Sequence, residues 1–334
     1  MKILITGAAG FIGYHLSKRL ITRGNNIVIG VDNLNDYYDI NLKKQRLKSL
    51  SSIKNNNFFF LKTDIANYEN LKKIFNQHKI DIIINLAAQA GVRYSIENPR
   101  EYFNSNLLGF FNLLDLSKKY KIKHLISAST SSVYGEDPSL RLKASKPADH
   151  PIQFYAATKR STEIMGHSYS HIHRLPITML RFFTVYGPWG RPDMSLFLFV
   201  KNIINKKKIK VFNFGNHSRD FTYIDDIVDG ICLVIKKKPT CGKKNINSSN
   251  STAPFKILNL GRGKKVKLMK FINDIEKNLK IKAKIYYLKK QKGDVQETLS
   301  DISETKKYIN YNPKIDTKMG IKKFINWYKS YYIK

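Results

Sequence analysis

Hydrophobic residues in the N-terminal part of the chain alternate between two patterns. Short β-branched runs separate longer stretches in which apolar residues recur every three or four positions. The short runs predict buried strands, and the longer stretches predict amphipathic helices. Strands are expected at 2–6, 27–31, 58–62, 82–86, 124–129 and 177–182, and helices at 11–23, 41–50, 69–78, 102–120 and 154–170. This repeated order predicts an α/β fold in which helices cover a parallel sheet.

The alternation ends near Phe183, and this change divides the chain. Loops rich in Gly, Pro and Asn follow, with shorter elements expected at 208–212 and 266–279. We therefore expect a doubly wound, Rossmann-type domain over residues 1–182 and a smaller C-terminal α/β substrate lobe over residues 183–334. Segments 222–236 and 256–261 are expected to return to the first domain.

The composition is that of a globular protein with an excess of positive charge. With 334 residues and 42% hydrophobic content, the chain can bury a full core, which excludes a disordered or fibrous protein. Its 59 Lys and Arg residues against 25 Asp and Glu give a net charge of +34, which favours binding to polyanions. The excess is mostly Lys scattered through every segment, and no recognised nucleic-acid-binding module accompanies it. We expect no nucleic-acid partner, although the charge can steer an anionic substrate.

The sequence favours a cytoplasmic protein. No window approaches the roughly 20 consecutive apolar residues that a membrane helix needs, the closest being the interrupted stretch 227–235. The chain begins directly with an apolar strand, without a basic segment or a cleavage site. Cys232 and Cys241 match neither a disulfide framework nor a zinc site. We expect neither a metal nor a membrane partner.

A glycine-rich turn between the first strand and the first helix predicts a dinucleotide site. Gly7, Gly10 and Gly13 have the spacing at which glycine permits a tight turn, close approach of a pyrophosphate and packing of helix on strand. Asp32 ends the second strand 19 residues after Gly13, where a carboxylate binds both ribose hydroxyls and repels a 2′-phosphate. Since Asn33 follows and no Arg is present there, NAD is favoured over NADP. The alternatives are that the glycines form a purely structural turn and that Asp32 is an ordinary turn residue at the end of a strand.

Two further strand ends are expected to meet the cofactor. Asp64 follows the third strand on the side of the adenine. The small residues Ala87 and Ala88, after Leu86, let the cofactor lie close to the end of the fourth strand. Together with the glycines and Asp32, these positions define the expected NAD site.

Tyr155 and Lys159 form the candidate acid/base pair. They are four residues apart on the helix expected at 154–170, so both side chains emerge on the same face. A tyrosine with its ordinary pKa of about 10 is a weak base at neutral pH, but a neighbouring ammonium is expected to lower that pKa. Lys159 can also hold the nicotinamide ribose. We expect Thr130, with Ser132 second, to share a hydrogen bond with the substrate oxygen. Decoration of a surface helix is the alternative.

These motifs together resemble the extended short-chain dehydrogenase/reductases that act on nucleotide sugars. The resemblance covers the chain from Lys2 to Tyr328, and the subgroup that the sequence resembles most is the bacterial UDP-glucuronate 4-epimerases. Four strings carry the similarity: GVDNLNDYYD at 30–39, AAQAGVRYS at 87–95, YAATKRSTE at 155–163 and LRFFTVYGPWGRPDM at 180–194. A UDP-galactose 4-epimerase is expected to differ in the second and fourth strings.

The resemblance implies an enzyme that interconverts UDP-glucuronate and UDP-galacturonate through a 4-keto intermediate. Tyr155 would take the proton of the sugar 4-hydroxyl while hydride passes transiently from C4 to tightly bound NAD. A UDP-glucuronate decarboxylase shares this first step and is the main alternative, followed by a UDP-glucose or UDP-N-acetylglucosamine 4-epimerase. A non-catalytic NAD sensor or basic nucleic-acid-associated protein is disfavoured, because neither needs Tyr155 and Lys159.

The resemblance also implies roles for individual residues. Phe183 would line the nicotinamide, and Arg93 and Arg191 would bind the hexuronate carboxylate, since a planar guanidinium does so with two hydrogen bonds. A loop salt bridge is the alternative for each Arg. Cofactor contacts are expected from Gly7, Gly10, Phe11, Ile12, Gly13, Asp32, Asn33, Asp64, Ile65, Leu86, Ala87, Ala88, Gln89, Asn106, Tyr155, Lys159 and Phe182.

Substrate contacts are implied in the second lobe and beside the hydroxyl cluster. Thr184 would lie toward the sugar, Arg219 on the diphosphate and Asp294 on the uridine ribose, while Val211 and Phe212 would border the uracil. The full expected set is Arg93, Ser131, Thr184, Arg191, Val211, Phe212, Arg219 and Asp294. A homodimer in which helices 102–120 and 154–170 form a four-helix bundle is implied as well, as is a role in surface polysaccharide synthesis.

Overall fold

A seven-stranded parallel sheet forms the centre of the protein. The structure, a computed structural model, describes residues 1–24, 26–53, 57–242 and 246–333. The strand order is β10-β6-β5-β4-β1-β2-β3, and all neighbouring pairs are parallel. The strands are β1 (Lys2–Thr6), β2 (Ile27–Asp32), β3 (Phe58–Lys62), β4 (Ile82–Asn85), β5 (His124–Thr130), β6 (Ile177–Phe182) and β10 (Phe255–Leu260). The prediction of a doubly wound, Rossmann-type α/β fold is confirmed.

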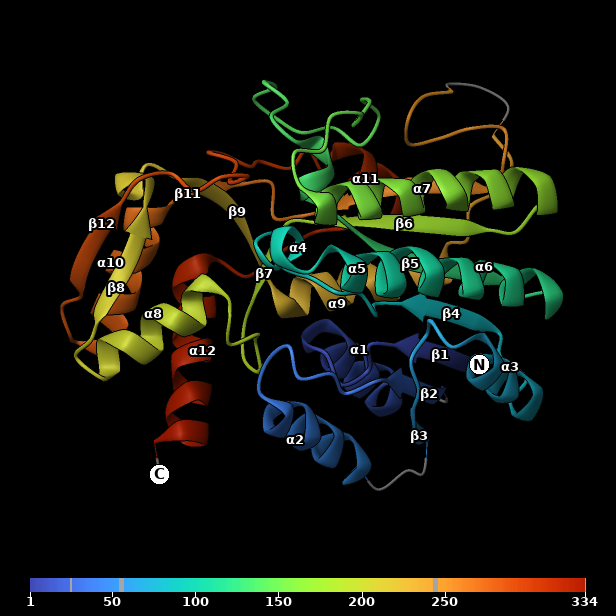
Figure 1. Cartoon of the computed structure of the whole chain (residues 1–334), viewed down its shortest axis with the longest axis horizontal. Helices are drawn as coiled ribbons and strands as arrows, with labels where there is room; N and C mark the ends of the chain where they lie inside the picture. The colour runs from blue at the N-terminus through green and yellow to red at the C-terminus, as the bar shows by residue number, and fades with distance from the viewer. Residues whose placement is uncertain (25, 54–56, 243–245, 334) are drawn as a thin grey trace.

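Helices cover both faces of this sheet, and side chains of alternate strand residues pack against them. Ile3 and Ile5 of β1 belong to a core shared with one set of helices, whereas Leu4 belongs to the core on the opposite face. On the first face lie α1 (Phe11–Thr22), α2 (Ile40–Ser51) and α9 (Ile224–Lys236); on the second lie α3 (Tyr68–Gln77), α6 (Gly109–Lys119) and α7 (Phe154–His173). Figure 1 shows α6 and α7 side by side along the sheet. Burial on both faces explains the continuous apolar strands.

The helix expected at 102–120 is interrupted. The structure has short helices α4 (Tyr94–Glu97) and α5 (Pro99–Tyr102), then a π-helix at Phe103–Leu108, and only then α6. The wider π turn contains Asn106, whose side chain is buried and hydrogen-bonded to other segments. Short π segments inside helices accommodate such contacts, and the apolar periodicity does not reveal them.

A second group of elements begins after β6. β7 (Thr184–Tyr186) and β11 (Lys265–Lys267) flank β9 (Ser218–Tyr223), and β12 (Lys284–Leu288) pairs with β8 (Lys208–Phe212). The stretch 266–279 combines part of β11 with helix α10 (Leu268–Leu279). The remaining helices are α8 (Ser195–Ile204), α11 (Ser303–Ile309) and α12 (Thr317–Tyr332). In Figure 1, β8, β12, α8 and α10 lie together to one side of the large sheet, whereas α9 lies against it.

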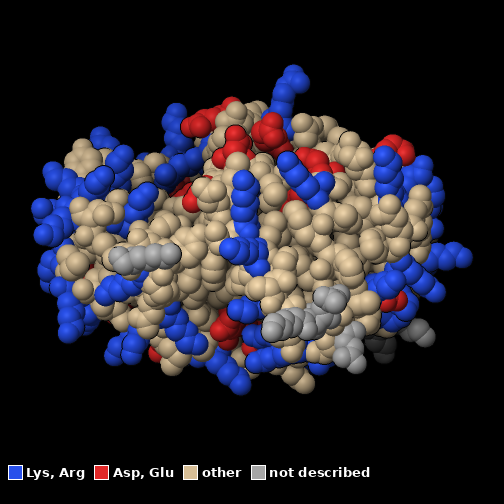
Figure 2. All heavy atoms as spheres, turned by 90° about the horizontal axis from the view of Figure 1, so that it is seen from below, with Lys and Arg blue, Asp and Glu red and all other residues tan. Residues whose placement is uncertain are grey.

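Basic side chains are spread over the surface. On the face drawn in Figure 2, Lys and Arg stand at many separate places among uncharged residues, with smaller groups of Asp and Glu between them. On this face, such a distribution raises the positive potential without forming a groove of one charge. Among the helices of the described segments, none has both the length and the apolar character required to cross a bilayer.

Candidate active site

A single large cleft brings most of the predicted site residues together. It has a volume of about 1040 Å³ and is lined at one end by the glycine-rich turn and at the other by residues of β8, β9 and the segment 291–298. The cleft opens beyond the carboxyl ends of β1, β2, β4, β5 and β6, which is where open α/β sheets bind ligands. Its size suits a dinucleotide together with a second extended ligand.

The glycine-rich turn leaves no room for side chains. Gly7 has φ +70°, and a Cβ there would lie 2.8 Å from the backbone of Leu86 and Ala87. A Cβ at Gly13 would collide with the carbonyl oxygen of Gly7, so helix and turn pack in direct contact. The first residues of α1 line the cleft, so the N-terminal end of this helix faces it, as a pyrophosphate site requires. This cradle fits the phosphates of a dinucleotide.

Asp32 lies at the end of β2 within reach of this turn. Its carboxylate accepts hydrogen bonds from the backbone N–H groups of Ala9 at 3.1 Å and Leu34 at 2.9 Å. Burial raises the pKa of this carboxyl, opposed by these two bonds and by the charge of Lys43. Lys43 itself is buried and donates to the Asn35 backbone and side-chain oxygens, both at 2.6 Å. The acid is thus held rigidly at the cleft wall.

Asp64 and the end of β4 continue the cofactor side of the cleft. The Asp64 carboxylate accepts a hydrogen bond from the Asn33 side chain at 2.9 Å. Ile65 and the run Leu86, Ala87, Ala88 and Gln89 line the same wall. Asn106 differs from the prediction, because it does not line the cleft: its side chain bonds the Gln89 backbone at 2.9 and 3.1 Å and Thr158 at 3.0 Å. Through these hydrogen bonds, the Asn106 amide fixes the Gln89 backbone, which is part of the cleft wall.

Tyr155 and Lys159 face the cleft from α7, and Thr130 faces it from the end of β5. Lys159 is only 2% exposed, which is uncommon for a lysine and contradicts the alternative of a decorated surface helix. The Thr130 hydroxyl oxygen accepts a hydrogen bond from the Ser132 N–H at 3.1 Å. Ser131 and Ser132 follow in a short 3-10 turn and also line the cleft. The predicted triad of hydroxyl, phenol and ammonium is therefore assembled.

The pKa of Tyr155 differs in direction from the prediction. Burial raises it, and a hydrogen bond with Thr130 and the charge of Arg191 only partly oppose this effect. The expectation that the Lys159 ammonium holds it below its ordinary value was therefore wrong for this structure, because removal from water outweighs the nearby charges. Burial lowers the pKa of Lys159 to about 8, opposed by the charge of Glu163.

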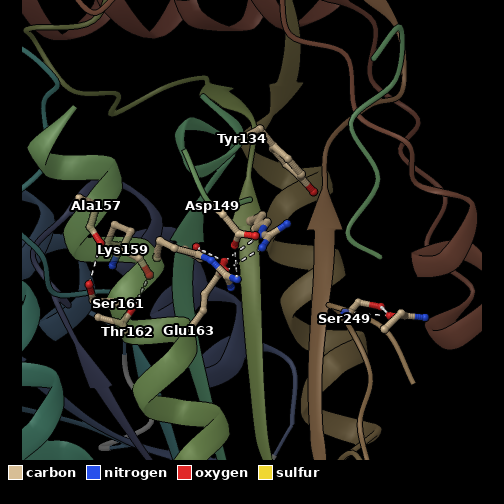
Figure 3. Close-up of polar contacts among 12 residues, drawn as sticks. Tyr134, Asp149, Ala157, Lys159, Ser161, Thr162, Glu163 and Ser249 are labelled. Carbon is tan, nitrogen blue, oxygen red and sulfur yellow. Dashed lines mark hydrogen bonds and ion pairs between the residues drawn. The ribbon is translucent and has the colours of Figure 1, made fainter. Parts of the chain in front are cut away.

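Glu163 lies one turn after Lys159 and is the centre of a buried polar cluster (Figure 3). Its carboxylate accepts two hydrogen bonds from Arg181 of β6, at 2.8 and 2.7 Å, and one from Ser129 of β5 at 2.6 Å. Arg160 approaches the same carboxylate at 3.1 Å. Burial alone would raise the pKa of Glu163, but Arg181 and these hydrogen bonds hold it below its usual value. The cluster attaches the helix of Tyr155 and Lys159 to two strands.

The far end of the cleft contains the residues expected to hold a nucleotide. Arg219 donates to Asp294 at 2.7 Å, and Nε2 of His217 lies 3.2 Å from the second oxygen of Asp294. The Arg93 guanidinium stacks over the Phe212 ring, 4.8 Å from its centre. Phe182, Phe183 and Thr184 line the middle of the cleft.

Val211 does not border the cleft as predicted. It is fully buried in the hydrophobic core, whereas its neighbours Lys210 and Phe212 line the cleft. Side chains of a strand point alternately to opposite faces, so two consecutive residues of β8 cannot both face one ligand. Phe212 therefore keeps the position in the cleft that the resemblance implies, and Val211 does not.

Several cleft residues were not predicted from the sequence. They include Asn35, Tyr37, Tyr38, Lys43, Gln153, Asp193, Lys210 and His217. Tyr37, Tyr38 and Asp193 belong to two of the strings that carried the family resemblance, and this membership was the available signal. Lys43 lies in an amphipathic helix, where a charged residue ordinarily indicates the solvent face. Gln153 and His217 have no sequence signal that we can identify.

The glycine-rich turn, the carboxylate at the end of β2 and the Tyr155 and Lys159 pair in one cleft define a dinucleotide-dependent enzyme of the tyrosine/lysine type. The model of the NAD dependent epimerase/dehydratase family matches residues 3–247, and the chain belongs to this family. Among its relatives, protein CapI of Staphylococcus aureus is 49% identical over 338 residues, which cover 100% of both chains. UDP-glucuronate 4-epimerase of Thermodesulfobacterium geofontis is 44% identical and covers 98% of this chain and 95% of its own.

A solved structure supports the same relationship. The crystal structure of UDP-glucuronic acid 4-epimerase from Bacillus cereus, in complex with UDP-glucuronic acid and NAD, superposes with a TM-score of 0.88 at 34% identity. The match covers 99% of this chain and 100% of that chain. The similarity therefore includes both the sheet and the second group of elements, and the resemblance to the nucleotide-sugar epimerases is confirmed.

Proposed function

We propose that this protein is an NAD-dependent UDP-glucuronate 4-epimerase. The observation that carries the proposal is the continuous cleft in which a dinucleotide cradle, the Tyr155 and buried Lys159 pair, and a far end with Arg93 and Arg219 follow one another. Relatives and a solved structure named as UDP-glucuronate 4-epimerases span nearly the whole chain. A sensor without catalysis would gain nothing from a lysine buried beside a tyrosine, since burying it costs free energy.

The residues present fit NAD. The turn at Gly7, Gly10 and Gly13 would hold the pyrophosphate, and Asp32 would accept the adenosine ribose hydroxyls. Asn33, Asp64 and Ile65 would border the adenine, and Lys159 would hold the nicotinamide ribose. Phe11, Ile12, Leu86, Ala87, Ala88, Gln89 and Phe182 would complete the wall around the cofactor. When bound, NAD supplies a reversible acceptor for the hydride at C4 of the sugar.

Tyr155 is the proposed general base and acid at the sugar 4-hydroxyl. Thr130 shares a hydrogen bond with it and would orient the same hydroxyl, with Ser132 as the second candidate. The charge of Arg191 opposes the rise in the pKa of Tyr155 that burial causes, and the Lys159 ammonium would hold the nicotinamide ribose nearby. Tyr155 would therefore take the proton of the sugar 4-hydroxyl and return it in the reverse step.

The substrate would extend from Tyr155 to the far end of the cleft. Arg219 would bind the diphosphate, Asp294 the uridine ribose, and Phe212 would border the uracil. Ser131 and Thr184 would face the sugar, and Arg191 would bind the carboxylate. Arg93, which was expected to bind the carboxylate as well, instead lies over the Phe212 ring at the nucleotide end of the cleft. Holding the carboxylate would keep it out of alignment with the developing ketone, which disfavours decarboxylation.

The proposed function is tested by incubating the purified protein with UDP-glucuronate and analysing the products. We expect UDP-galacturonate without release of carbon dioxide, and NAD in the supernatant after the protein is denatured. UDP-xylose with carbon dioxide would identify a decarboxylase instead. No reaction with UDP-glucuronate but turnover of UDP-glucose or UDP-N-acetylglucosamine would identify a neutral-sugar epimerase.

We also propose a cytoplasmic homodimer, with residues 1–182 as the NAD-binding domain and residues 183–334 mainly as the sugar-nucleotide lobe. Large apolar side chains are exposed on the π-helix, α6 and α7, including Phe103 (54%), Phe111 (43%) and Ile164 (57%). Burying such a patch in a two-fold interface would stabilise a pair of chains. Light scattering should give twice the mass of one chain, and Ile164→Arg should give a monomer. A wild-type monomer would contradict the proposal.

A further inference from the structure

One loop of the cleft, residues 187–194, accepts charged hydrogen bonds from a segment on the cofactor side of the protein. This arginine loop connects β7 to α8 and carries Arg191. The segment that holds it, residues 35–46, follows β2 and includes the start of α2. Segment 35–46 overlaps the string at 30–39, and the arginine loop lies within the string at 180–194. Both strings are typical of the subgroup, although 140 residues separate them. Nothing in the proposed mechanism explains why these two strings should occur together.

Arg46 makes the first connection. Its guanidinium donates to the Trp189 carbonyl at 2.5 Å and the Gly190 carbonyl at 3.4 Å, the two residues directly before Arg191. The same guanidinium donates to the Ala9 carbonyl in the glycine-rich turn at 2.9 Å and to the Tyr38 hydroxyl at 2.7 Å. Arg46 is fully buried. It thus connects the cofactor turn with the arginine loop directly.

Tyr37 makes the second connection. Its hydroxyl donates to the Asp193 carboxylate at 3.2 Å, and the Arg191 guanidinium lies over its ring, 5.8 Å from the centre. Asp193 in turn accepts two hydrogen bonds from Arg191, at 3.0 and 2.5 Å. Tyr37 therefore contacts both members of the Arg191 and Asp193 pair, one through its ring and the other through its hydroxyl.

The loop needs such external support. Trp189 has φ +60°, a backbone conformation that costs free energy for a residue with a large side chain. Its carbonyl is held by Arg46, and its ring packs against Trp327 and Tyr331 of α12 at 5.5 and 5.1 Å. A buried guanidinium is stable only where acceptors are fixed, so Arg46 and the strained loop determine each other's geometry.

We propose that Tyr37 and Arg46 are positioning residues that fix Arg191 for a carboxylate on the substrate, so that segment 35–46 determines the preference for a hexuronate over a neutral hexose. This inference rests on the proposed function. Neither side chain needs to touch the sugar carboxylate. Each acts through the arginine loop. Because Arg191 is already ordered before the substrate binds, a substrate whose carboxylate binds Arg191 gains affinity.

The test compares binding of UDP-glucuronate and UDP-glucose to the NAD-bound protein by calorimetry. In Tyr37→Phe we expect Kd for UDP-glucuronate to rise by about tenfold, because a hydrogen bond to a charged group is lost. Kd for UDP-glucose should change less than about twofold, since that sugar has no carboxylate. Arg46→Lys should likewise raise Kd for UDP-glucuronate more than Kd for UDP-glucose, because one ammonium cannot span the Ala9 and Trp189 carbonyls. Thermal unfolding of each variant checks that it is folded.

A matched control is Tyr68→Phe, which removes a tyrosine hydrogen bond to Asp115 at 2.8 Å outside the cleft and should leave both affinities unchanged. Equal weakening of both sugars in Tyr37→Phe, or no change in either, would overturn the inference while leaving the proposed function intact. A wild-type protein that binds the two sugars equally would instead contradict the proposed function and, with it, the role given to Arg191.

Discussion

Tyr155→Phe is expected to lower kcat by about 10²- to 10⁴-fold while NAD remains bound. The variant removes only the hydroxyl that exchanges the proton of the sugar 4-hydroxyl, and the ring that contacts Tyr102 at 6.0 Å is retained. KM for UDP-glucuronate should change little, because the proposed substrate anchors Arg219 and Asp294 are unaffected. Steady-state product analysis measures kcat and KM, and release of NAD on denaturation measures how much NAD the variant retains.

The control for this variant lies on the same helix. Tyr169→Phe removes a hydroxyl from a half-buried α7 residue that does not line the cleft and keeps its packed ring, so kcat should stay within about twofold of wild type. If Tyr155→Phe retained wild-type turnover, the assignment of the general base would be wrong. Loss of both turnover and bound NAD would indicate instead that the hydroxyl is needed to hold the cofactor.

Glu163→Gln is expected to lower the free energy of unfolding by about 3–5 kcal/mol, the usual cost of leaving one charge of a buried pair without its partner. Arg181 is fully buried, and Glu163 provides its two charged hydrogen-bond acceptors at 2.7 and 2.8 Å. Urea unfolding measures the change. Glu136→Gln is the matched control, because Glu136 is 67% exposed and its Lys290 partner is 3.9 Å away. That exposed pair should contribute about 0–1 kcal/mol.

Glu163→Gln should also alter the pH dependence of activity. Burial lowers the pKa of Lys159 to about 8, and the Glu163 charge opposes this shift. Removing that charge should lower the pKa further, so Lys159 loses its proton at lower pH and the alkaline decline in kcat/KM begins earlier. The groups facing Glu163 are Arg160 and Lys159 on α7, Arg181 on β6 and Tyr134 after β5.

A double variant separates the two effects of Glu163. Replacing Arg181 by Gln together with Glu163→Gln removes both buried charges, so part of the lost stability should return. The alkaline decline should stay displaced to lower pH, because the carboxylate near Lys159 is still absent. An alkaline limb that returns with stability would show that Glu163 acts only on folding, and an unchanged limb in both variants would exclude an effect on Lys159.

The sequence by itself determined the large sheet and the local parts of the site. β1, β3 and β6 have the predicted bounds, because each is a short apolar run that can be recognised without its neighbours, whether the strand is buried, like β1 and β6, or at the sheet edge, like β3. The glycine spacing and the four-residue interval between Tyr155 and Lys159 are likewise local. A turn conformation and a shared helix face depend on residues close together in the chain. These signals placed the cofactor cradle and the acid/base pair in one cleft.

Only the tertiary structure decided the features that depend on distant residues. It turned Val211 into the core and Phe212 into the cleft, because the face of β8 depends on what packs against it. It directed the Asn106 amide to Gln89 and raised the pKa of Tyr155 by burial. It also joined Arg46 to Trp189 across 143 residues. Periodicity and spacing report local geometry, whereas burial and pairing of charges arise only when separate segments meet.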